Sequence, residues 1–463
     1  MSEAPNDAGP VADVRRELQG GRGAFVGSPF TVQLDVVGYE ERELEASGTA
    51  TSYRADGELT SDGRWSFVPG VSAPYRTRVL VRLPTDPARF SGTAVVEWLN
   101  VSGGVDADVE WTSLNEEITR RGHAWLGVSS QRIGVIGGPV LVEGPDVPER
   151  AVAGKGLRGI DPARYGALDH PGDGFAFDIF TQVGRAVVAG AALSGRRPRR
   201  VIAAGESQSA IAMVTYYNGV HPLAGAFDGF FVHSRGAFGL PLVAPGQHAD
   251  IAGSMAGIPV VFRTDLDTPV LDVQSEADVT GVLNSFVSRQ PDHERFRLWE
   301  VAGTAHADKH LLGPAARVLD CGLPINDGPM HLVVKAAFRA LEMWMVDGVA
   351  PPSAARLEVD AGPVPAVRRN GDGIAIGGVR TPPVDVPVAA LSGEPGPGPS
   401  MLCLLLGSTT AFSAERLGAL YPSKAAYLDR YAACADATIE AGFVLDEDRG
   451  TLLAFADPSG IRD

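Results

Sequence analysis

Ser207 lies in a segment whose residue types and order suit a nucleophile. An apolar run at residues 201–204 ends at Gly205, and a segment with helical spacing begins at Ala210. The serine therefore lies on a tight turn between a strand and a helix, where small neighbours let the backbone bend and expose the hydroxyl. The nucleophile elbow has this arrangement, with the pattern G-x-S-x-G. The segment here reads G-E-S-Q-S, so a serine replaces the second glycine.

A histidine and two carboxylates follow later segments that read as strands. Residues 297–301 run into a loop that carries His306, and residues 269–273 run into a loop with Glu276 and Asp278. In open α/β sheets, ligands bind outside the carboxyl ends of the strands. Acyl transfer from a serine needs a base to accept its proton and a carboxylate to orient that base. Either Asp278 or Glu276 is suited to be this acid.

The oxyanion of an acyl-transfer intermediate needs two N–H donors held in place. In a nucleophile elbow the residue after the serine supplies one donor, which assigns the first role to the backbone N–H of Gln208. The loop at residues 100–104 follows an expected strand and contains two glycines, which let its amides turn toward a ligand. We expect Asn100 or Val101 to supply the second donor.

Short apolar strands alternate with helical segments along most of the chain. This order predicts an α/β fold with a mostly parallel, doubly wound sheet and helices on both faces. The expected strands are residues 30–37, 43–53, 76–83, 93–99, 123–128, 201–204, 229–233, 269–273 and 296–301. The expected helices are residues 111–121, 177–193, a segment from 209, 330–346 and 424–441.

Five segments resemble a known family: 95–100 (VVEWLN), 205–209 (GESQS), 274–278 (QSEAD), 300–308 (EVAGTAHAD) and 325–329 (INDGP). In these segments the chain resembles the α/β-hydrolases, and it is most similar to bacterial alpha/beta hydrolase domain-containing proteins, some of which are esterases. The order serine, acid, histidine is also the order of α/β-hydrolases. The resemblance implies an α/β-hydrolase fold and hydrolysis of a carboxylic ester through a covalent acyl-enzyme.

The resemblance also bears on the choice of acid. In many family members the carboxylate closes a G-x-x-D segment after this strand, and S-E-A-D, ending at Asp278, matches with serine for glycine. Glu276 is nearer the strand end and has a longer reach, so it remains the alternative. We expect whichever carboxylate is not the acid to bind loop backbone.

The same triad serves other reactions. Amidases, lactonases and acyltransferases use this triad too. Whether water or another acceptor reacts with the acyl-enzyme depends on how well the site excludes water. A protein of another class, a non-catalytic ligand-binding homologue, is also compatible with the fold. The presence of Ser207, His306 and an acid in order argues against that class.

Composition limits the partners. The chain has 463 residues and a net charge of −16, which disfavours binding to nucleic acid or anionic membranes. We therefore expect a small-molecule ester as partner, and the sequence leaves the oligomeric state open. No dinucleotide-binding or Walker motif is present, and His310, four residues after His306, has no carboxylate partner at zinc spacing. We expect no cofactor and no metal.

Composition also suggests an organisation. We expect a mobile N-terminus at 1–27, a core at 28–346 with a Gly- and Pro-rich lid excursion near 131–175, and a loop-rich segment with a helical extension at 347–463 that packs on the core. Three cysteines without a C-x-x-C pair favour a reduced, cytoplasmic protein, and no signal peptide is recognised. A bridge between Cys321 and Cys403 remains an alternative.

Overall fold

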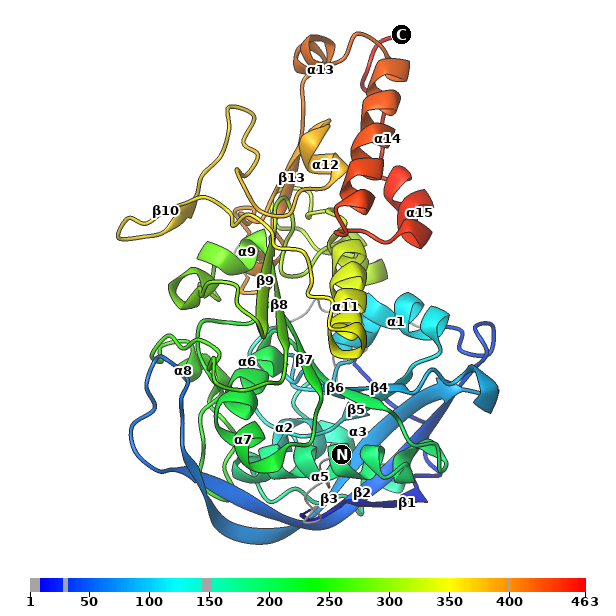
Figure 1. The fold of residues 1–463 in the computed structure, drawn as a ribbon, viewed down its shortest axis with the longest axis vertical. Coiled ribbons are helices and arrows are strands. Elements are labelled where there is room, and N and C mark those ends of the chain that lie inside the picture. Colours follow the sequence, from blue (N-terminus) through cyan, green and yellow to red (C-terminus); the bar gives the residue numbers. More distant parts are fainter. Residues whose placement is uncertain (1–8, 28–31, 144–151, 399) are drawn as a thin grey trace. The chain divides into compact units, whose positions relative to one another are not determined.

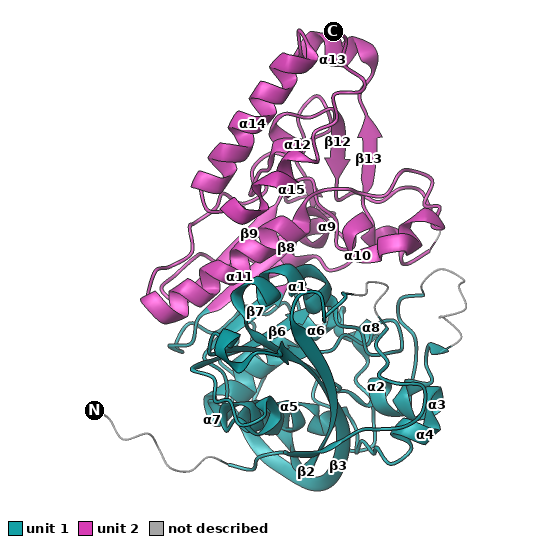
Figure 2. Cartoon of the chain, turned by 90° about the vertical axis from the view of Figure 1, so that its right-hand side faces the viewer, with its two compact units in different colours: residues 1–232, 237–269 teal, residues 233–236, 270–463 magenta. Residues whose placement is uncertain are grey.

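A computed structural model describes residues 9–27, 32–143, 152–398 and 400–463 (Figure 1). The chain forms two compact units (Figure 2). Unit 1 consists of Met1–Val232 and Ala237–Pro269, and unit 2 of His233–Gly236 and Val270–Asp463. The boundary between the two units does not coincide with the boundary expected at residue 346. The strands that precede the two candidate acids and the candidate histidine belong to the same unit as the C-terminal segment.

The described part of unit 1 holds a twisted sheet with the strand order β1-β2-β3-β5-β4-β6-β7. The strands are β1 (Asp13–Glu17), β2 (Tyr39–Ala55), β3 (Phe67–Pro84), β4 (Thr93–Trp98), β5 (Ala124–Val128), β6 (Arg200–Glu206) and β7 (Gly229–His233). The first three strands pair antiparallel, and β3 is also antiparallel to β5. β4 is parallel to both β5 and β6, so the candidate nucleophile follows a strand in the parallel part of the sheet.

Helices cover both faces of this sheet. Adjacent residues of a strand point to opposite faces, and Trp98 at the end of β4 contacts Phe177 and Phe180 of α5 (Ala176–Val188). Its neighbour Glu97 accepts hydrogen bonds from the first turn of α1 (Val109–Arg121). α1 and α5 therefore lie on opposite faces, and the predicted α/β class with helices on both faces is confirmed.

The remaining helices of unit 1 are short. They are α2 (Arg132–Ile136), α3 (Gly156–Ile160), α4 (Pro162–Tyr165), α6 (Gln208–Thr215), α7 (His221–Ala224) and α8 (Ile251–Ser254). Three of them lie in the excursion at residues 131–175, of which residues 144–151 are outside the described residues. A lid role for this excursion stays a prediction.

Unit 2 is built on the parallel pair β8 (Val270–Ser275) and β9 (Phe296–Val301). Its helices are α9 (Glu276–Thr280), α10 (Lys309–Leu312), α11 (Met330–Asp347), α12 (Pro382–Asp385), α13 (Ala414–Leu420), α14 (Lys424–Glu440) and α15 (Arg449–Leu453). Two small hairpins pair β10 (Val359–Asp360) with β11 (Ala366–Val367) and β12 (Ala389–Ser392) with β13 (Ser408–Ala411).

The C-terminal segment packs on β9 and α11 within unit 2. The ring of Phe443 meets Trp299 of β9 edge-on at a centroid distance of 4.9 Å. Lys335 of α11 and Asp448 form a buried ion pair at 3.0 Å. The segment is therefore part of the body of this unit.

Two sequence predictions near the N-terminus are wrong. The expected strand at 30–37 is absent from its described part, because residues 34–38 form turns. The expected mobile N-terminus instead contains strand β1, which pairs with the edge of β2. The sequence hides this strand because only Val14 of its five residues is buried, so no apolar alternation is visible.

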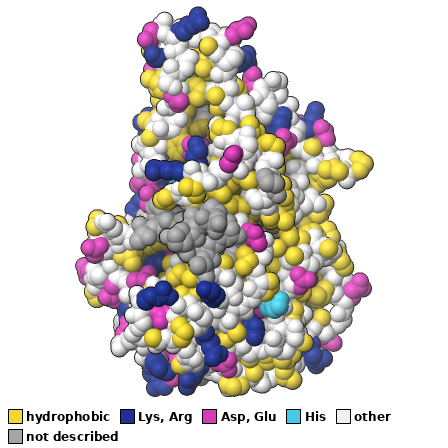
Figure 3. Space-filling view, turned by 180° about the vertical axis from the view of Figure 1, so that it is seen from behind, with side chains coloured by type: hydrophobic (Ala, Val, Ile, Leu, Met, Phe, Trp, Pro, Cys, Tyr) yellow, Lys and Arg dark blue, Asp and Glu magenta, His cyan; other side chains and the backbone are white. Residues whose placement is uncertain are grey.

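Charged side chains of both signs are interspersed on the face shown in Figure 3. Among the described residues, no helix combines the length and hydrophobicity needed to cross a membrane. The expected partners and compartment stay predictions.

Cys321 and Cys403 form a disulfide within unit 2, the alternative that the sequence left open. Cys434 is free. Disulfides persist mainly in oxidising compartments, so the bridge weighs against the reduced state expected from the cysteine pattern. It ties together two loop segments that lie 82 residues apart in the chain.

We predict that reduction of this bridge lowers the free energy of unfolding by about 2–5 kcal/mol, because cross-linking a long loop restricts the unfolded chain. Guanidinium denaturation with and without a reducing agent measures the effect. Cys434→Ser should retain the full difference, whereas Cys321→Ser should abolish it. An equal response of wild type and Cys321→Ser to the reductant would contradict the prediction.

Candidate active site

Ser207 occupies the turn between β6 and α6 with a strained backbone, at φ 56° and ψ −118°. A non-glycine residue in such a conformation costs on the order of 1–3 kcal/mol, and this strain is concentrated at functional sites. Gly205 makes the sharp turn feasible, because a Cβ atom there would lie 2.8 Å from the backbone of Ser209. The local geometry is that of a nucleophile elbow.

Ser209, which replaces the second glycine of the pattern, has a bonding role of its own. Its Oγ accepts a hydrogen bond from the backbone N–H of Glu206 at 2.9 Å and donates to the carbonyl oxygen of Glu206 at 2.8 Å. These contacts close the turn around Ser207. The departure from the usual pattern thus adds hydrogen bonds across the elbow.

The loop after β4 binds the elbow directly. The Nδ2 of Asn100 donates to the carbonyl oxygen of Glu206 at 3.1 Å. The backbone N–H of Asn100 donates to Ala107, and that of Val101 donates to the side-chain Oε1 of Gln208 at 3.1 Å. Both expected second donors are therefore engaged with protein groups, and their oxyanion role stays a prediction.

The side chain of Gln208 was not anticipated from the sequence. Its Nε2 donates to Oε1 of Gln131 at 2.6 Å, and the same oxygen accepts from Nε1 of Trp98 at 2.9 Å. All three side chains are buried. This amide chain connects the start of α6 with the loops after β4 and β5, a long-range arrangement for which the sequence carries no local signal.

In unit 2 the structure brings His306 and Asp278 together. The Nδ1 of His306 lies 2.7 Å from Oδ1 of Asp278, and the carboxylate is fully buried. Its other oxygen accepts from the backbone N–H of Ser275 at 2.7 Å, which closes a capping box at the start of α9. With Nδ1 donating to the carboxylate, Nε2 of the neutral ring carries no proton and is the basic nitrogen.

The charge state of Asp278 follows from its contacts. Burial raises the pKa of Asp278, but the charge and hydrogen bond of His306, together with the nearby Ser234 and Ser275, outweigh burial and lower that pKa below its ordinary value. Asp278 is therefore an anion beside the imidazole, as an orienting carboxylate must be.

Glu276 binds loop backbone instead. Its Oε2 accepts from the N–H of Gly303 at 2.7 Å, and its Oε1 accepts from Gly393 at 2.8 Å and from Arg369 at 2.5 Å. The structure thus places Asp278, and not Glu276, against the histidine. Glu276 instead links the segment that leads to His306 with the loop that follows β12.

The loop that carries His306 is held by distant parts of unit 2. The N–H of Ala307 donates to the carbonyl oxygen of Leu405 at 3.0 Å. The Nδ2 of Asn326 donates to the carbonyl oxygens of Gly303 and Ser392, at 3.1 and 3.0 Å. The segment after residue 390 is therefore part of the support of the histidine, which sequence patterns did not indicate.

Comparison with known proteins identifies the family. The family model described as alpha/beta hydrolase domain matches residues 8–454. The chain belongs to the α/β-hydrolases. No curated protein sequence matches it at a significant level.

Solved structures similar to this α/β-hydrolase include hydrolases and esterases of low sequence identity. An α/β serine hydrolase without lid from Xanthomonas campestris has 12% identity and a TM-score of 0.30, covering 63% of this chain and 94% of that one. The esterase domain of a Rhodothermus marinus protein has 12% identity and a TM-score of 0.31, covering 64% and 98%. An α/β serine hydrolase homologue from Coxiella burnetii has 14% identity and a TM-score of 0.28, covering 53% and 88%.

His310 lies against another histidine. Its ring stacks on that of His331 at a centroid distance of 3.7 Å and an angle of 5°. Among the described residues of this α/β-hydrolase, no group of three or more His, Cys, Asp or Glu side chains is placed to hold a metal ion. The absence of a metal and of a cofactor stays a prediction.

Asp308, two residues after His306, gives this α/β-hydrolase a pH-dependent stability. Burial raises the pKa of Asp308 from 3.8 to about 6, although its carboxylate accepts from the N–H of Leu311 at the start of α10. Because the pKa in the folded state is the higher one, folding favours the protonated acid. Ionisation therefore destabilises the fold as the pH rises from about 4 to about 6.

We predict that Asp308→Asn is more stable than wild type at pH 7 by up to about 3 kcal/mol, and that this difference disappears near pH 4. The asparagine keeps the oxygen that caps α10 and removes the buried charge. Chemical denaturation of both proteins across this pH range measures the difference. Parallel stability curves for the two proteins would show that Asp308 does not titrate in this range.

Proposed function

We propose that this α/β-hydrolase cleaves a carboxylic ester through a covalent acyl-enzyme. The observation that carries the proposal is the buried hydrogen bond between His306 and Asp278, because it prepares a histidine as a proton acceptor. The strained elbow at Ser207 supports it independently. The proposal requires that Ser207 and His306 act on one substrate.

In the first half of the reaction, the Oγ of Ser207 attacks the ester carbonyl carbon while Nε2 of His306 accepts the hydroxyl proton. Asp278 stabilises the resulting imidazolium through Nδ1–H. The tetrahedral intermediate collapses, the C–O bond to the alcohol breaks, and His306 returns the proton to the departing alkoxide. In the second half, water replaces the alcohol and releases the acid, with His306 again transferring the proton.

The oxyanion is proposed to bind the backbone N–H of Gln208 and that of Asn100 or Val101. The N–H of Val101 already donates to Oε1 of Gln208 at 3.1 Å. An oxyanion at Val101 would compete with this oxygen for the same N–H. Substrate binding at Val101 therefore requires that the Gln208 side chain moves or shares this donor.

Labelling of Ser207 tests the nucleophile. A fluorophosphonate should form one adduct on Ser207, and Ser207→Ala should keep its fold while losing labelling and nearly all hydrolysis of p-nitrophenyl esters. Ser61→Ala, which removes the hydroxyl of an exposed serine, is the control and should label like wild type. An unlabelled wild-type protein would favour a non-catalytic, ligand-binding homologue.

The two acids should respond differently to loss of charge. Asp278→Asn should lower kcat by about 10⁴, because an amide can hold the imidazole in the wrong tautomer and cannot stabilise the imidazolium. Glu276→Gln should mainly lower the free energy of unfolding, by about 1–3 kcal/mol, because it weakens buried hydrogen bonds. Kinetics and denaturation of both variants are compared. A larger loss of kcat in Glu276→Gln would reverse the assignment.

A further inference from the structure

Ser234 follows β7 in a backbone conformation that serine seldom adopts. Its φ is 54°, and it is one of four non-glycine residues with positive φ in the described chain. Like Ser207, it directly follows a core strand. Its N–H donates to the carbonyl oxygen of Val273 on β8 at 2.7 Å, and its side chain is fully buried. Strain of this kind persists only where surrounding contacts impose it.

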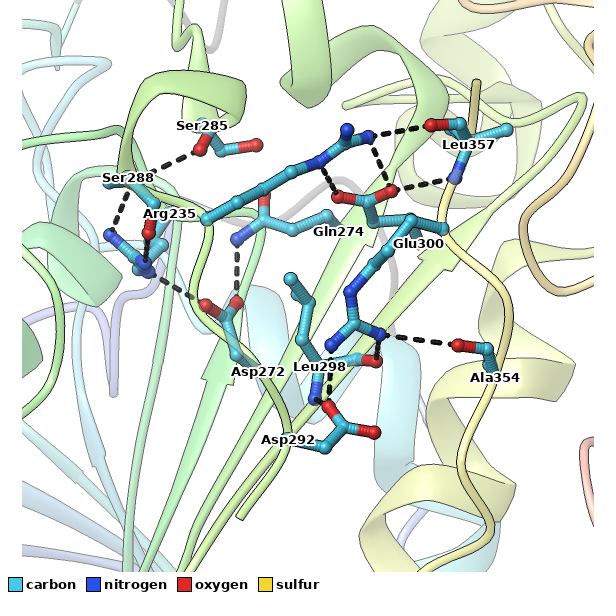
Figure 4. Close-up of polar contacts among 12 residues, drawn as sticks. Arg235, Asp272, Gln274, Ser285, Ser288, Asp292, Leu298, Glu300, Ala354 and Leu357 are labelled. Carbon is cyan, nitrogen blue, oxygen red and sulfur yellow. Dashed lines mark hydrogen bonds and ion pairs between the residues drawn. The ribbon is translucent and has the colours of Figure 1, made fainter. Parts of the chain in front are cut away.

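The side chain of Arg235, the next residue, is bound to two other segments of unit 2 (Figure 4). Its Nε donates to Oδ2 of Asp272 on β8 at 2.7 Å, and both side chains are buried. Its other nitrogens donate to the hydroxyl and the carbonyl oxygen of Ser288, at 3.1 and 3.2 Å. A buried ion pair contributes little net stability but fixes geometry. Arg235 is therefore an anchor that holds the corner at 233–236 on β8.

The corner places Ser234 beside the end of β8, where the backbone N–H of Ser275 donates to the carboxylate of Asp278. This hydroxyl is buried and makes no hydrogen bond of good geometry to a described residue. An unsatisfied buried donor is costly. The carboxylate of Asp278 is an acceptor close enough for Ser234 to lower its pKa.

Other charged groups on these elements have partners of their own. Ion pairs join Asp272 to Arg235, Glu276 to Arg369 and Glu300 to Arg289. Asp308 is the remaining nearby acid, and it interacts electrostatically with His233. Among the described groups, the anion of Asp278 is thus left to His306, Ser275 and Ser234.

We infer that Ser234 is a positioning residue, whose hydroxyl donates to the carboxylate of Asp278 and so fixes the oxygen that holds Nδ1 of His306. This role rests on the proposed function, since it matters only if the pair transfers protons. With Ser234, Asp278 has hydrogen-bond donors from three separate segments, at residues 234, 275 and 306. Rotation of the carboxylate away from the imidazole then breaks at least one contact.

Ser234→Gly tests the inference, because glycine accepts φ 54° and removes the hydroxyl together with its Cβ atom. Ser194→Gly is the matched control, since Ser194 has the same φ of 54° on an exposed turn of unit 1. The readouts are the downfield proton resonance of His306 Nδ1–H, assigned by its loss in Asp278→Asn, and the pH dependence of ester hydrolysis.

In Ser234→Gly we expect the Nδ1–H resonance to move downfield, because the carboxylate then shares its charge with one donor fewer. The acid limb of the pH–rate profile should move to higher pH, and kcat should fall about tenfold with KM unchanged. Ser194→Gly should match wild type in all three. A wild-type resonance and profile in Ser234→Gly would overturn the inference.

If Ser234→Gly does not fold, Ser234→Cys fills the same space with a weak donor and should show the same shift to a smaller extent. An unchanged resonance in that variant also overturns the inference. Because the NMR readout needs no turnover, it tests the contact between Ser234 and Asp278 separately from the proposed ester hydrolysis. A shift without any ester hydrolysis in wild type would contradict the proposed function while supporting the contact.

Discussion

The backbone of Ser207 is the constraint on which the rest of unit 1 depends. A serine at φ 56° is unfavourable by itself, so the surrounding structure must hold it. The parallel strands fix β6 from one side, Gly205 admits the close approach of α6, and Ser209 ties the two ends of the turn together. The sheet therefore acts as a support for one unfavourable torsion angle.

Buried carboxylates perform a similar task in several places. Glu97 on β4 accepts from two N–H groups in the first turn of α1 and from the indole of Trp125 at 2.8 Å. Burial raises the pKa of Glu97 well above its ordinary value. Glu276 binds two loop amides in unit 2. Glu97 thereby joins the end of β4 to the following helix, and Glu276, directly after β8, joins the loops that follow β9 and β12.

The sequence allowed prediction of those features that depend on local order. The sequence predicted that Ser207 and His306 follow strands, as they do in the structure, and the spacing of S-E-A-D favoured the carboxylate that lies beside the histidine. Contacts made by distant residues could not be found in this way. The hydrogen bond from Val101 to the Gln208 side chain joins residues 107 positions apart. Strand β1 was missed because its neighbour in the sheet, not its own sequence, makes it a strand.

The support of the histidine loop by residues near 392–406 has a consequence for synthesis of the protein. The ribosome completes the elbow long before it makes Leu405, whose carbonyl oxygen holds Ala307, or Leu406, which binds Asn326. The nascent chain can thus form the serine turn while its histidine loop still lacks these contacts. If His306 is the proposed base, catalytic competence arises late in translation, and a chain that ends before residue 405 lacks this support.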